Sequence, residues 1–283
     1  MEIRHVSQRL GRLSSFLKNE MGMSTALMNK LKWDNKILVN GKPEHNDFTV
    51  QPGDVITAVL DEETPTFPAQ KGKLNIIYED EHILVVDKPS GMLIHPSHAT
   101  MTGTLANFVL GHYEKTGQKS AFHPLTRLDR DTFGIVLIAK NAHMHTLLRE
   151  KGNLKKTYHA LVLGVPPRRS GTINAPIARR PLPSLLRFVS PQGKPSVTEY
   201  KLLTSDGKCS LLELTPVTGR THQLRVHCAY IHLPILGDPQ YGTEEAKKYA
   251  IHQQLCAKTL EFDHPVTGKR MVLSSRLNVS KNG

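Results

Sequence analysis

The sequence predicts an α+β protein with two domains: a small N-terminal α/β domain over residues 1–64, and a larger domain over residues 65–283 built on a central mixed, mainly antiparallel sheet. Its 283 residues exceed what one domain of roughly 100–200 residues needs. Residues 61–72 (DEETPTFPAQKG) mix acids, Pro and Gly without an apolar period, as linkers do. Beyond them, several apolar segments alternate between faces, which favours a mixed or antiparallel sheet over a doubly wound parallel one.

The first sixty residues are predicted to form two helices followed by short strands. Apolar residues in RLGRLSSFLKNEMG recur at helical steps before Gly22, where a helix commonly stops: Leu10, Leu13, Leu17 and Met21. A second amphipathic helix is expected after Ser24, an N-cap residue type. A strand then enters an Asn-Gly turn at residues 40–41, and another strand follows the Pro-Gly at residues 52–53.

Strands are predicted in the second domain at residues 83–86, 135–139, 158–163 and 211–214. Stretches of mixed length separate them, and no repeat of fixed period is present. In the third strand, Tyr158 shares a face with Ala160 and Val162, so one phenol lies on an otherwise small apolar face. From the residues alone, a core tyrosine with a satisfied hydroxyl is the commoner outcome.

The composition is that of a folded, cationic protein. Lys and Arg number 37 against 25 Asp and Glu, a formal charge of +12 that makes a polyanion the expected partner. Apolar runs fall well short of the roughly 18 residues of a membrane span, and the first residues lack the apolar stretch of a secretory signal. We therefore expect no membrane partner and a cytoplasmic location. Three cysteines without a CxxC spacing argue against a disulfide framework and a thiolate zinc site.

Basic residues gather in two parts of the chain. The predicted N-terminal helices and the strand after them carry Arg9, Arg12, Lys18, Lys30, Lys32 and Lys36. A second run is opposed by Glu199 alone and consists of Arg168, Arg169, Arg179, Arg180, Arg187, Lys194 and Lys201. Such density favours contact with RNA phosphate, and an aromatic content of 6% argues for structured RNA rather than long single strands.

Two segments carry candidate catalytic groups. Asp129 lies between Arg127 and Arg130 in RLDRDTFG, and adjacent positive charge keeps a carboxylate ionised, as nucleophilic or base catalysis requires; a solvated turn is the alternative. The segment TGRTHQLRVH, taken as a helix from about Thr221, places Arg225 where it can hold a carboxylate bidentately. A surface ion-pair helix is the alternative here.

No cofactor and no metal is expected. The chain has neither a P-loop nor a GxGxxG segment after a strand. The histidine pairs at residues 222 and 227 and at residues 143 and 145 lack the i, i+4 spacing of metal ligands on a helix. Solvated or hydrogen-bonded histidines are therefore favoured over metal ligands.

Taken together, these segments resemble the RluA-type (RluA/RluC/RluD) family of RNA pseudouridine synthases. Five segments occur in the family's order: VVDKPSGMLIHPS, RLDRDTFG, KKTYHALVLG, TGRTHQLRVH with PILGDPQYG, and LEFDHPVTGK. The N-terminal part, with KILVNGK and a later PGD, resembles the S-four-type RNA-binding domain. The resemblance implies a pseudouridine synthase fold and a monomeric isomerase that converts specific uridines of RNA to pseudouridine without a cofactor.

The resemblance also implies roles for individual residues. Asp129 is the catalytic aspartate, Tyr158 the tyrosine beneath the target base, and Arg225 the arginine that pairs with the aspartate. Arg127 would fill the stack that the flipped nucleotide vacates. Further substrate-binding residues are expected at Arg220, His222 and Lys88.

Three positions depart from the usual pattern of the family. Thr126 stands where a His usually precedes RLD, Phe133 where a Ser precedes the Gly, and His232 where a Gly is common. None of them is a proposed catalytic group, so the departures bear on substrate detail more than on activity. A His can also adopt the left-handed backbone that a Gly would supply.

Several alternatives remain open at this point. Ribosomal RNA is the expected substrate and transfer RNA the leading alternative. Asp129 either attacks the anomeric carbon or takes the neighbouring sugar proton. A catalytically silent RNA-binding or ribosome-assembly factor of the same fold is a second hypothesis, and a metal-dependent nuclease or deaminase is a third. The presence of Asp129, Tyr158 and Arg225 argues against the second, and the histidine spacings argue against the third.

Overall fold

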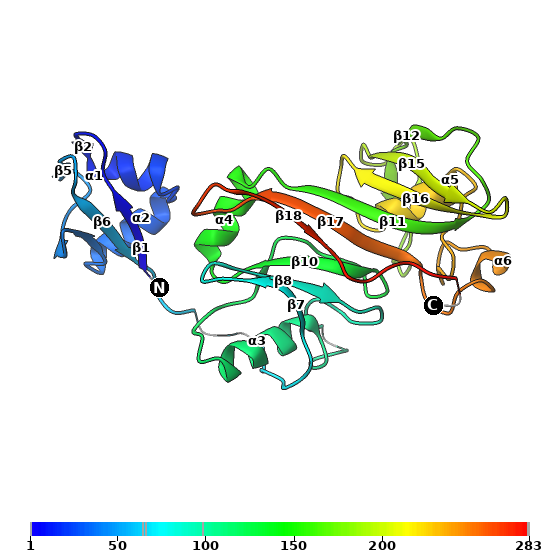
Figure 1. The fold of residues 1–283 in the computed structure, drawn as a ribbon, viewed down its shortest axis with the longest axis horizontal. Helices are drawn as coiled ribbons and strands as arrows, with labels where there is room; N and C mark the ends of the chain where they lie inside the picture. Colours follow the sequence, from blue (N-terminus) through cyan, green and yellow to red (C-terminus); the bar gives the residue numbers. More distant parts are fainter. Residues whose placement is uncertain (1, 64, 66, 98, 282–283) are drawn as a thin grey trace. The chain divides into compact units, whose positions relative to one another are not determined.

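The computed structural model describes residues 2–63, 65, 67–97 and 99–281. The chain forms two compact units, Met1–Thr64 and Pro65–Gly283 (Figure 1), and the division falls inside the segment taken as a linker. Each unit has its own core and is described separately. In the described residues no helix is both long enough and apolar enough to cross a membrane.

The first unit is a small sheet with helices. Its four-stranded sheet has the order β1-β6-β3-β4, and the strands β2 and β5 form a separate pair. The strands are β1 (Glu2–Val6), β2 (Gly11–Arg12), β3 (Ile37–Val39), β4 (Lys42–Pro43), β5 (Thr49–Val50) and β6 (Val55–Val59). The helices are α1 (Leu13–Ser15), which continues into the π-helical turn η1 (Phe16–Glu20), and α2 (Thr25–Trp33).

Local signals in this unit act as predicted at two places. The Ser24 side chain caps α2 by accepting a hydrogen bond from the backbone N–H of Leu27 at 3.2 Å. Asn40 and Gly41 both take positive φ, 50° and 81°, as a two-residue hairpin turn between β3 and β4 requires. The core beneath them consists mainly of Leu13, Phe16, Leu17, Met28, Leu31, Ile37 and Ile56.

The prediction for the first helix was wrong at its start. Leu10 is 59% exposed, and the helix begins only at Leu13. The reason is that Gly11 and Arg12 pair with β5 as the strand β2. The edge strand β1 was missed. It has only five residues, none of them fully buried, so its alternation of apolar and polar residues is weak in the sequence.

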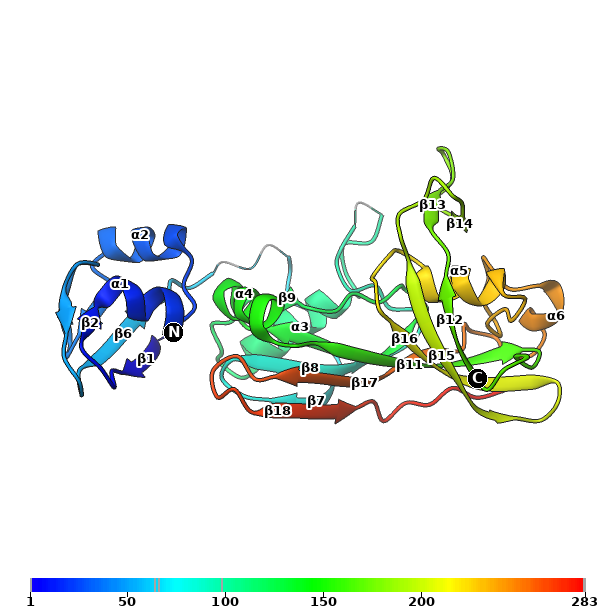
Figure 2. The same ribbon diagram turned by 90° about the horizontal axis from the view of Figure 1, so that it is seen from above.

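The second unit is built on a ten-stranded sheet (Figures 1 and 2). The order is β12-β15-β16-β11-β17-β10-β8-β7, with β18 paired to β17 and β9 to β10. Its strands are β7 (Asn75–Glu79), β8 (Ile83–Lys88), β9 (His123–Pro124), β10 (Phe133–Ala139), β11 (Lys155–Leu163), β12 (Ser170–Asn174), β15 (Val197–Ser205), β16 (Cys209–Pro216), β17 (Leu255–Asp263) and β18 (Arg270–Ser274). The pair β10-β17 is parallel and the other strand pairs of this sheet are antiparallel, which confirms the predicted mixed α+β fold.

The four predicted strands are confirmed within β8, β10, β11 and β16. All residues of β8 and β10 are buried, as expected of apolar strands at the centre of a sheet. Along β11 the burial alternates, and Tyr158, Ala160 and Val162 form the buried face, as predicted. The helix α3 (Leu105–Lys115) packs on β8 and β10, and the remaining helices are α4 (Ala142–Lys151), α5 (Gln223–Tyr230) and α6 (Glu244–Lys247).

A hairpin projects from the sheet of the second unit (Figure 2). Its strands β13 (Ile177–Arg179) and β14 (Arg187–Val189) form a separate two-stranded pair. Its connecting loop exposes Leu182 and Leu185, and α5 packs against β14 at the base of the hairpin. The hairpin therefore carries exposed basic and apolar side chains away from the sheet, and its base lies beside α5.

Candidate active site

The segment that carries Asp129 lies between β9 and β10 and is anchored from three sides. Lys88 donates from its ammonium to three backbone carbonyls, of Pro89, Met92 and Arg130, at 2.9, 2.8 and 2.9 Å. Ser90 Oγ donates to the carbonyl of Asp131 at 3.0 Å. Gln253 Nε2 donates to Thr132 Oγ1 at 2.7 Å. These bonds fix the backbone on which the Asp129 side chain is carried.

Sheet topology brings Tyr158 to the same place. Phe133 at the start of β10 is paired with Cys256 of β17, and Tyr158 of β11 is paired with the next β17 residue, Ala257. The loop that carries Asp129 therefore enters β10 next to the level of Tyr158, and the charge of Asp129 acts on the Tyr158 phenol. Burial first, and then the charge of Asp129, raise the pKa of the Tyr158 phenol, so it stays protonated and can donate a hydrogen bond.

Arg225 joins this site from α5. Its Nη1 donates to Asp129 Oδ2 at 3.1 Å, although the two residues are 96 positions apart in the sequence. Its Nε and Nη2 donate to the two oxygens of Asp238, each at 2.8 Å, and Nη2 also donates to Gln240 Oε1 at 2.9 Å. The guanidinium plane is thus held on one side and presents its remaining edge to Asp129.

Arg225 and Asp238 both stay charged although they are buried. Burial opposes the charge of Arg225, but hydrogen bonds to Asp238 and the carboxylate charges outweigh it, and the pKa of the guanidinium is raised. Burial likewise disfavours the Asp238 carboxylate, yet hydrogen bonds from Arg225 lower its pKa overall. Backbone N–H groups of Gln240 and Tyr241 complete the partners of Asp238 at 2.9 and 3.0 Å.

His222 lies beside the carboxylate of Asp129. Its Nε2 is 3.8 Å from Asp129 Oδ2, and its Nδ1 is 2.8 Å from the hydroxyl of Tyr241. The helix starts at Gln223 and not near Thr221, because His222 takes a left-handed backbone with φ of 58° and serves as the N-cap. Burial lowers the pKa of the imidazole against the opposing charge of Asp129, so the neutral form is favoured.

The other predicted substrate-binding residues have different environments. Arg127 and Arg220 are exposed, and Arg220 donates from Nε to the carbonyl of Pro195 at 3.2 Å. Lys88 has no exposed surface, and three carbonyls surround its ammonium. One of these carbonyls belongs to Arg130, so Lys88 helps to hold the Asp129 segment, and its expected contact with substrate stays a prediction. His232 has φ of 61°, a left-handed backbone of the kind that a Gly at this position would adopt.

Supporting residues of the site were missed by sequence reasoning. Asp238 and Tyr241 lie within the quoted PILGDPQYG segment, which was the available signal, but nothing in the spacing pairs them with Arg225 and His222. Gln253 lies 121 positions from Thr132 and carried no signal at all. Within the described residues, no group of three or more His, Cys, Asp or Glu side chains is arranged to hold a metal ion.

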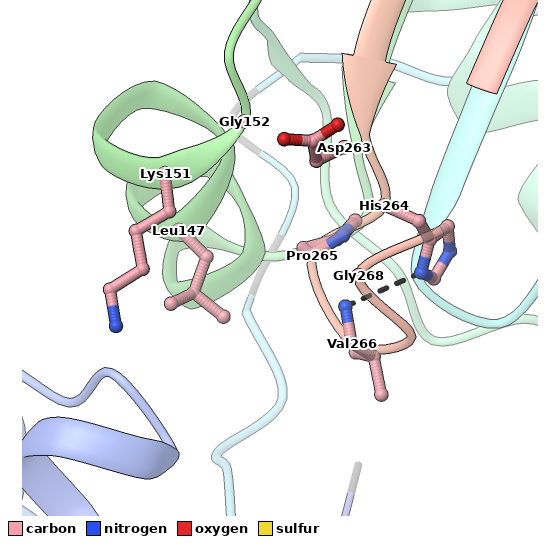
Figure 3. Close-up of a pocket in the computed structure, with 8 residues that line it drawn as sticks. All are labelled: Leu147, Lys151, Gly152, Asp263, His264, Pro265, Val266 and Gly268. Atoms are coloured by element: carbon pink, nitrogen blue, oxygen red, sulfur yellow. Dashed lines mark hydrogen bonds between the residues drawn. The ribbon is translucent and has the colours of Figure 1, made fainter. Parts of the chain in front are cut away.

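A pocket of about 260 Å³ lies elsewhere in the second unit, at the end of β17 remote from Cys256 (Figure 3). Leu147, Lys151, Asp263 and His264 are among its lining residues, and His264 is fixed by Asp80 at 2.8 Å. None of the proposed catalytic residues lines it. The chemistry of the Asp129 site therefore does not involve this pocket.

Comparisons with known proteins agree with one another. The family model described as RNA pseudouridylate synthase matches residues 82–230. The chain is 35% identical over 260 residues to an uncharacterized RNA pseudouridine synthase of Bacillus subtilis, YjbO, covering 89% of this chain and 90% of that protein. It is 36% identical over 255 residues to the ribosomal large subunit pseudouridine synthase D of Vibrio cholerae, covering 84% and 78%.

The fold has solved counterparts. The structure of human RNA pseudouridylate synthase domain containing 1 aligns with a TM-score of 0.59 at 24% identity, covering 76% of this chain and 93% of that chain. This likeness concerns the fold, whereas the sequence matches extend over most of the chain. The chain accordingly belongs to the RNA pseudouridylate synthase family, whose members are isomerases that act on RNA.

Proposed function

We propose that this RNA pseudouridine synthase modifies ribosomal RNA and that Asp129, Arg225 and Tyr158 carry the reaction. The single observation that supports the site most strongly is the 3.1 Å pair between Asp129 and Arg225, in which the arginine is 4% exposed and held by Asp238. The isomerisation needs a carboxylate held in a fixed orientation beside the extruded nucleotide, and the bond from Arg225 supplies that orientation.

The reaction breaks the bond from the ribose anomeric carbon to N1 of uracil and joins the same carbon to C5. The C5 proton leaves and N1 gains one, so no redox partner and no water is consumed. Asp129 either attacks the anomeric carbon or takes the neighbouring sugar proton, and both routes use the same anion. Arg225 keeps the carboxylate oriented, while the protonated Tyr158 bounds the base and can relay a proton.

Access to the base requires that the nucleotide leave its helix, at a cost of about a few kcal/mol. Exposed Arg127, two positions from Asp129, would offset part of this cost by stacking in the vacated space. Exposed Arg220 and the neighbouring His222 are proposed to contact the extruded nucleotide or its phosphates. Arginine suits this task because its planar guanidinium both stacks and pairs with phosphate.

Ribosomal RNA is proposed on two grounds. The Vibrio cholerae relative is named for the large ribosomal subunit, and the chain carries a formal charge of +12 that suits a structured polyanion. We also propose a cytoplasmic location, because the proposed substrate is ribosomal RNA. Asp129 and Arg225 of one chain contact each other directly, so the site needs no residue of a second copy, and a monomer stays part of the proposal.

The first unit is proposed to be an S-four-type RNA-binding domain. Arg12, Lys18 and Lys30 lie exposed on or beside its helices, where they can reach phosphate. These basic residues belong to the first unit, whereas all the proposed catalytic groups lie in the second unit.

The decisive experiment offers the purified protein transcripts of ribosomal RNA domains and transfer RNAs under identical conditions, followed by site-resolved mapping of pseudouridine. We expect modification of a specific uridine in a ribosomal transcript. Modification of transfer RNA alone would replace the proposed substrate. RNA binding without any pseudouridine would instead favour a silent binding or assembly factor.

A further inference from the structure

A chain of contacts runs from the projecting hairpin to the carboxylate of Asp129. Arg187, the first residue of β14, donates its backbone N–H to the hydroxyl of Tyr241 at 2.9 Å. That hydroxyl lies 2.8 Å from His222 Nδ1. On the other edge of the imidazole, Nε2 is 3.8 Å from Asp129 Oδ2. One phenol hydroxyl therefore joins the hairpin backbone to the imidazole beside the catalytic carboxylate.

The direction of the hydrogens follows from the donor and acceptor types. A backbone N–H can only donate, so Arg187 uses the acceptor capacity of the Tyr241 oxygen. A phenol oxygen could also accept from Nδ1, but among the described residues His222 Nδ1 is the one acceptor in contact with this hydroxyl, so we assign the hydroxyl as the donor and Nδ1 as the acceptor. A neutral imidazole carries one N–H, and with Nδ1 accepting, the proton lies on Nε2. The N–H that remains faces Asp129.

The surroundings hold this arrangement in place. His222 has a left-handed backbone at the N-cap of α5, an uncommon conformation for a residue with a side chain. The Tyr241 ring packs edge-on to the imidazole at 5.6 Å between centroids, and the Arg225 guanidinium lies 4.9 Å from its centre. The charged groups that act on the imidazole are Asp129, Arg225, Arg187 and Asp238. Burial lowers the pKa of the imidazole, and the charges of Arg225 and Arg187 act in the same direction against those of Asp129 and Asp238, so the neutral ring is favoured.

We propose that Tyr241 is a positioning residue that fixes His222 as the Nε2–H tautomer, so that His222 donates to Asp129 as a second hydrogen-bond donor beside Arg225. The inference rests on the proposed role of Asp129. Both donors address Oδ2 of the carboxylate, which leaves Oδ1 as the oxygen that would act on the ribose in this proposal. The 3.8 Å separation is longer than a hydrogen bond, and it closes when RNA fills the site, because catalytic hydrogen bonds often tighten only in the complex.

The hairpin has a part in this arrangement. Its backbone N–H at Arg187 occupies an acceptor site of the Tyr241 hydroxyl. The hairpin projects from the sheet (Figure 2), and its loop exposes Leu182 and Leu185. RNA that binds the hairpin thereby stabilises the hydrogen bond from Tyr241 to His222. Binding at the hairpin is in this way linked to the orientation of the Asp129 carboxylate.

The tautomer can be observed directly by ¹⁵N–¹H correlation of the histidine rings in the labelled full-length protein at about pH 8, above the ordinary pKa of histidine. The signal of His222 is assigned by its loss in His222→Asn. We expect the proton on Nε2 in the wild type and a mixture of tautomers in Tyr241→Phe. A proton on Nδ1 in the wild type, or an unchanged spectrum in Tyr241→Phe, overturns the proposal.

Single-turnover kinetics test whether the link through Tyr241 and His222 affects the reaction rate. Tyr241→Phe keeps the ring against Arg225 but removes the hydroxyl, so kcat should fall roughly three- to tenfold, the value of one neutral hydrogen bond, with KM unchanged. His222→Asn suits the left-handed backbone and keeps an acceptor for Tyr241 but removes Nε2. It should show a similar loss, and the double variant should lose no more than either single one. Tyr249→Phe, a tyrosine outside the site, is the matched control.

Two further measurements separate the possible failures. Melting temperatures of all variants show whether a loss reflects unfolding, and the wild-type spectrum needs no variant to be folded. If Asp129→Asn stays active in the same assay, the proposed catalytic site is wrong. If Asp129→Asn is inactive while Tyr241→Phe retains the wild-type kcat, or if the losses of the two variants multiply, only the link through Tyr241 and His222 is wrong.

Discussion

Asp238 grips Arg225 through two hydrogen bonds of 2.8 Å each, from a position with no exposed surface. The relationship matters because Arg225, which also donates to Gln240, makes its fourth hydrogen bond with Asp129, so one buried carboxylate fixes the arginine that orients another carboxylate. A buried arginine with a single partner would be free to turn away from the reacting group. Asp238, which lies in a local turn, thus holds Arg225 in the orientation that aligns Asp129.

Replacement of Asp238 by Asn should damage both stability and turnover. The variant keeps the shape and one acceptor but leaves the buried charge of Arg225 undercompensated, and breaking a buried pair costs up to about 3–5 kcal/mol. We expect a clearly lower melting temperature by calorimetry and a reduced kcat. Glu150→Gln breaks an exposed pair with Arg149 and serves as the control, which should melt like the wild type. An unchanged melting temperature in Asp238→Asn would contradict this account.

Replacement of Asp129 by Asn should abolish turnover without weakening RNA binding. The amide keeps the size of the side chain but lacks the anion that both proposed routes use, so the rate should fall by several powers of ten. Affinity rests on many contacts of Lys and Arg with phosphate and should be retained or slightly increased. Pseudouridine formation and filter binding on the same RNA measure the two effects.

The neighbouring Asp131 supplies the matched control for this substitution. Asp131 pairs with exposed Arg130 at 3.1 Å, and Asp131→Asn changes the charge by the same amount. It should retain most activity. Equal losses in both variants would mean that the catalytic acid is misassigned, and activity of Asp129→Asn, checked for deamidation, would refute the mechanism.

Activity should persist in the presence of a chelator. The isomerisation consumes no redox equivalent, and the proposed groups are a carboxylate, a phenol and a guanidinium. A stem-loop substrate that folds in monovalent salt should therefore be modified at the same rate with EDTA as with added Mg²⁺. Complete loss on chelation with recovery on addition of a metal ion would reject the proposed chemistry.

Removal of residues 1–64 should weaken RNA binding while leaving chemistry at saturating RNA intact. The removed unit carries exposed Arg12 and Lys18, which release counterions when they neutralise phosphates. The slope of log affinity against log salt should become less steep by about 0.9 for each phosphate of duplex-like RNA that the shortened protein leaves unneutralised. An unchanged slope with a lower melting temperature would identify the unit as a structural cap.

Much of the fold was predictable because its signals are local. The buried strand β10, the alternation of β11, the Ser24 cap and the Asn40-Gly41 turn each depend on residues a few positions apart, and their burial and backbone follow from that spacing. The edge strand β1 and the late start of α1 were not predictable, because pairing with β6 and β5 decides them.

By itself the sequence determined which residue types were available for catalysis and, through its segments, the family of the protein. Tertiary structure alone decided how they meet. Arg225 reaches Asp129 across 96 positions because β11 lies between β17 and β16 in the sheet, β10 pairs with β17, and α5 packs against β15 and β16. The same packing encloses Lys88 completely and brings the carbonyl of Arg130 to its ammonium. Burial and long-range geometry depend on which strands are neighbours, and the sequence around Lys88 carries no information on its distant carbonyl partner at Arg130.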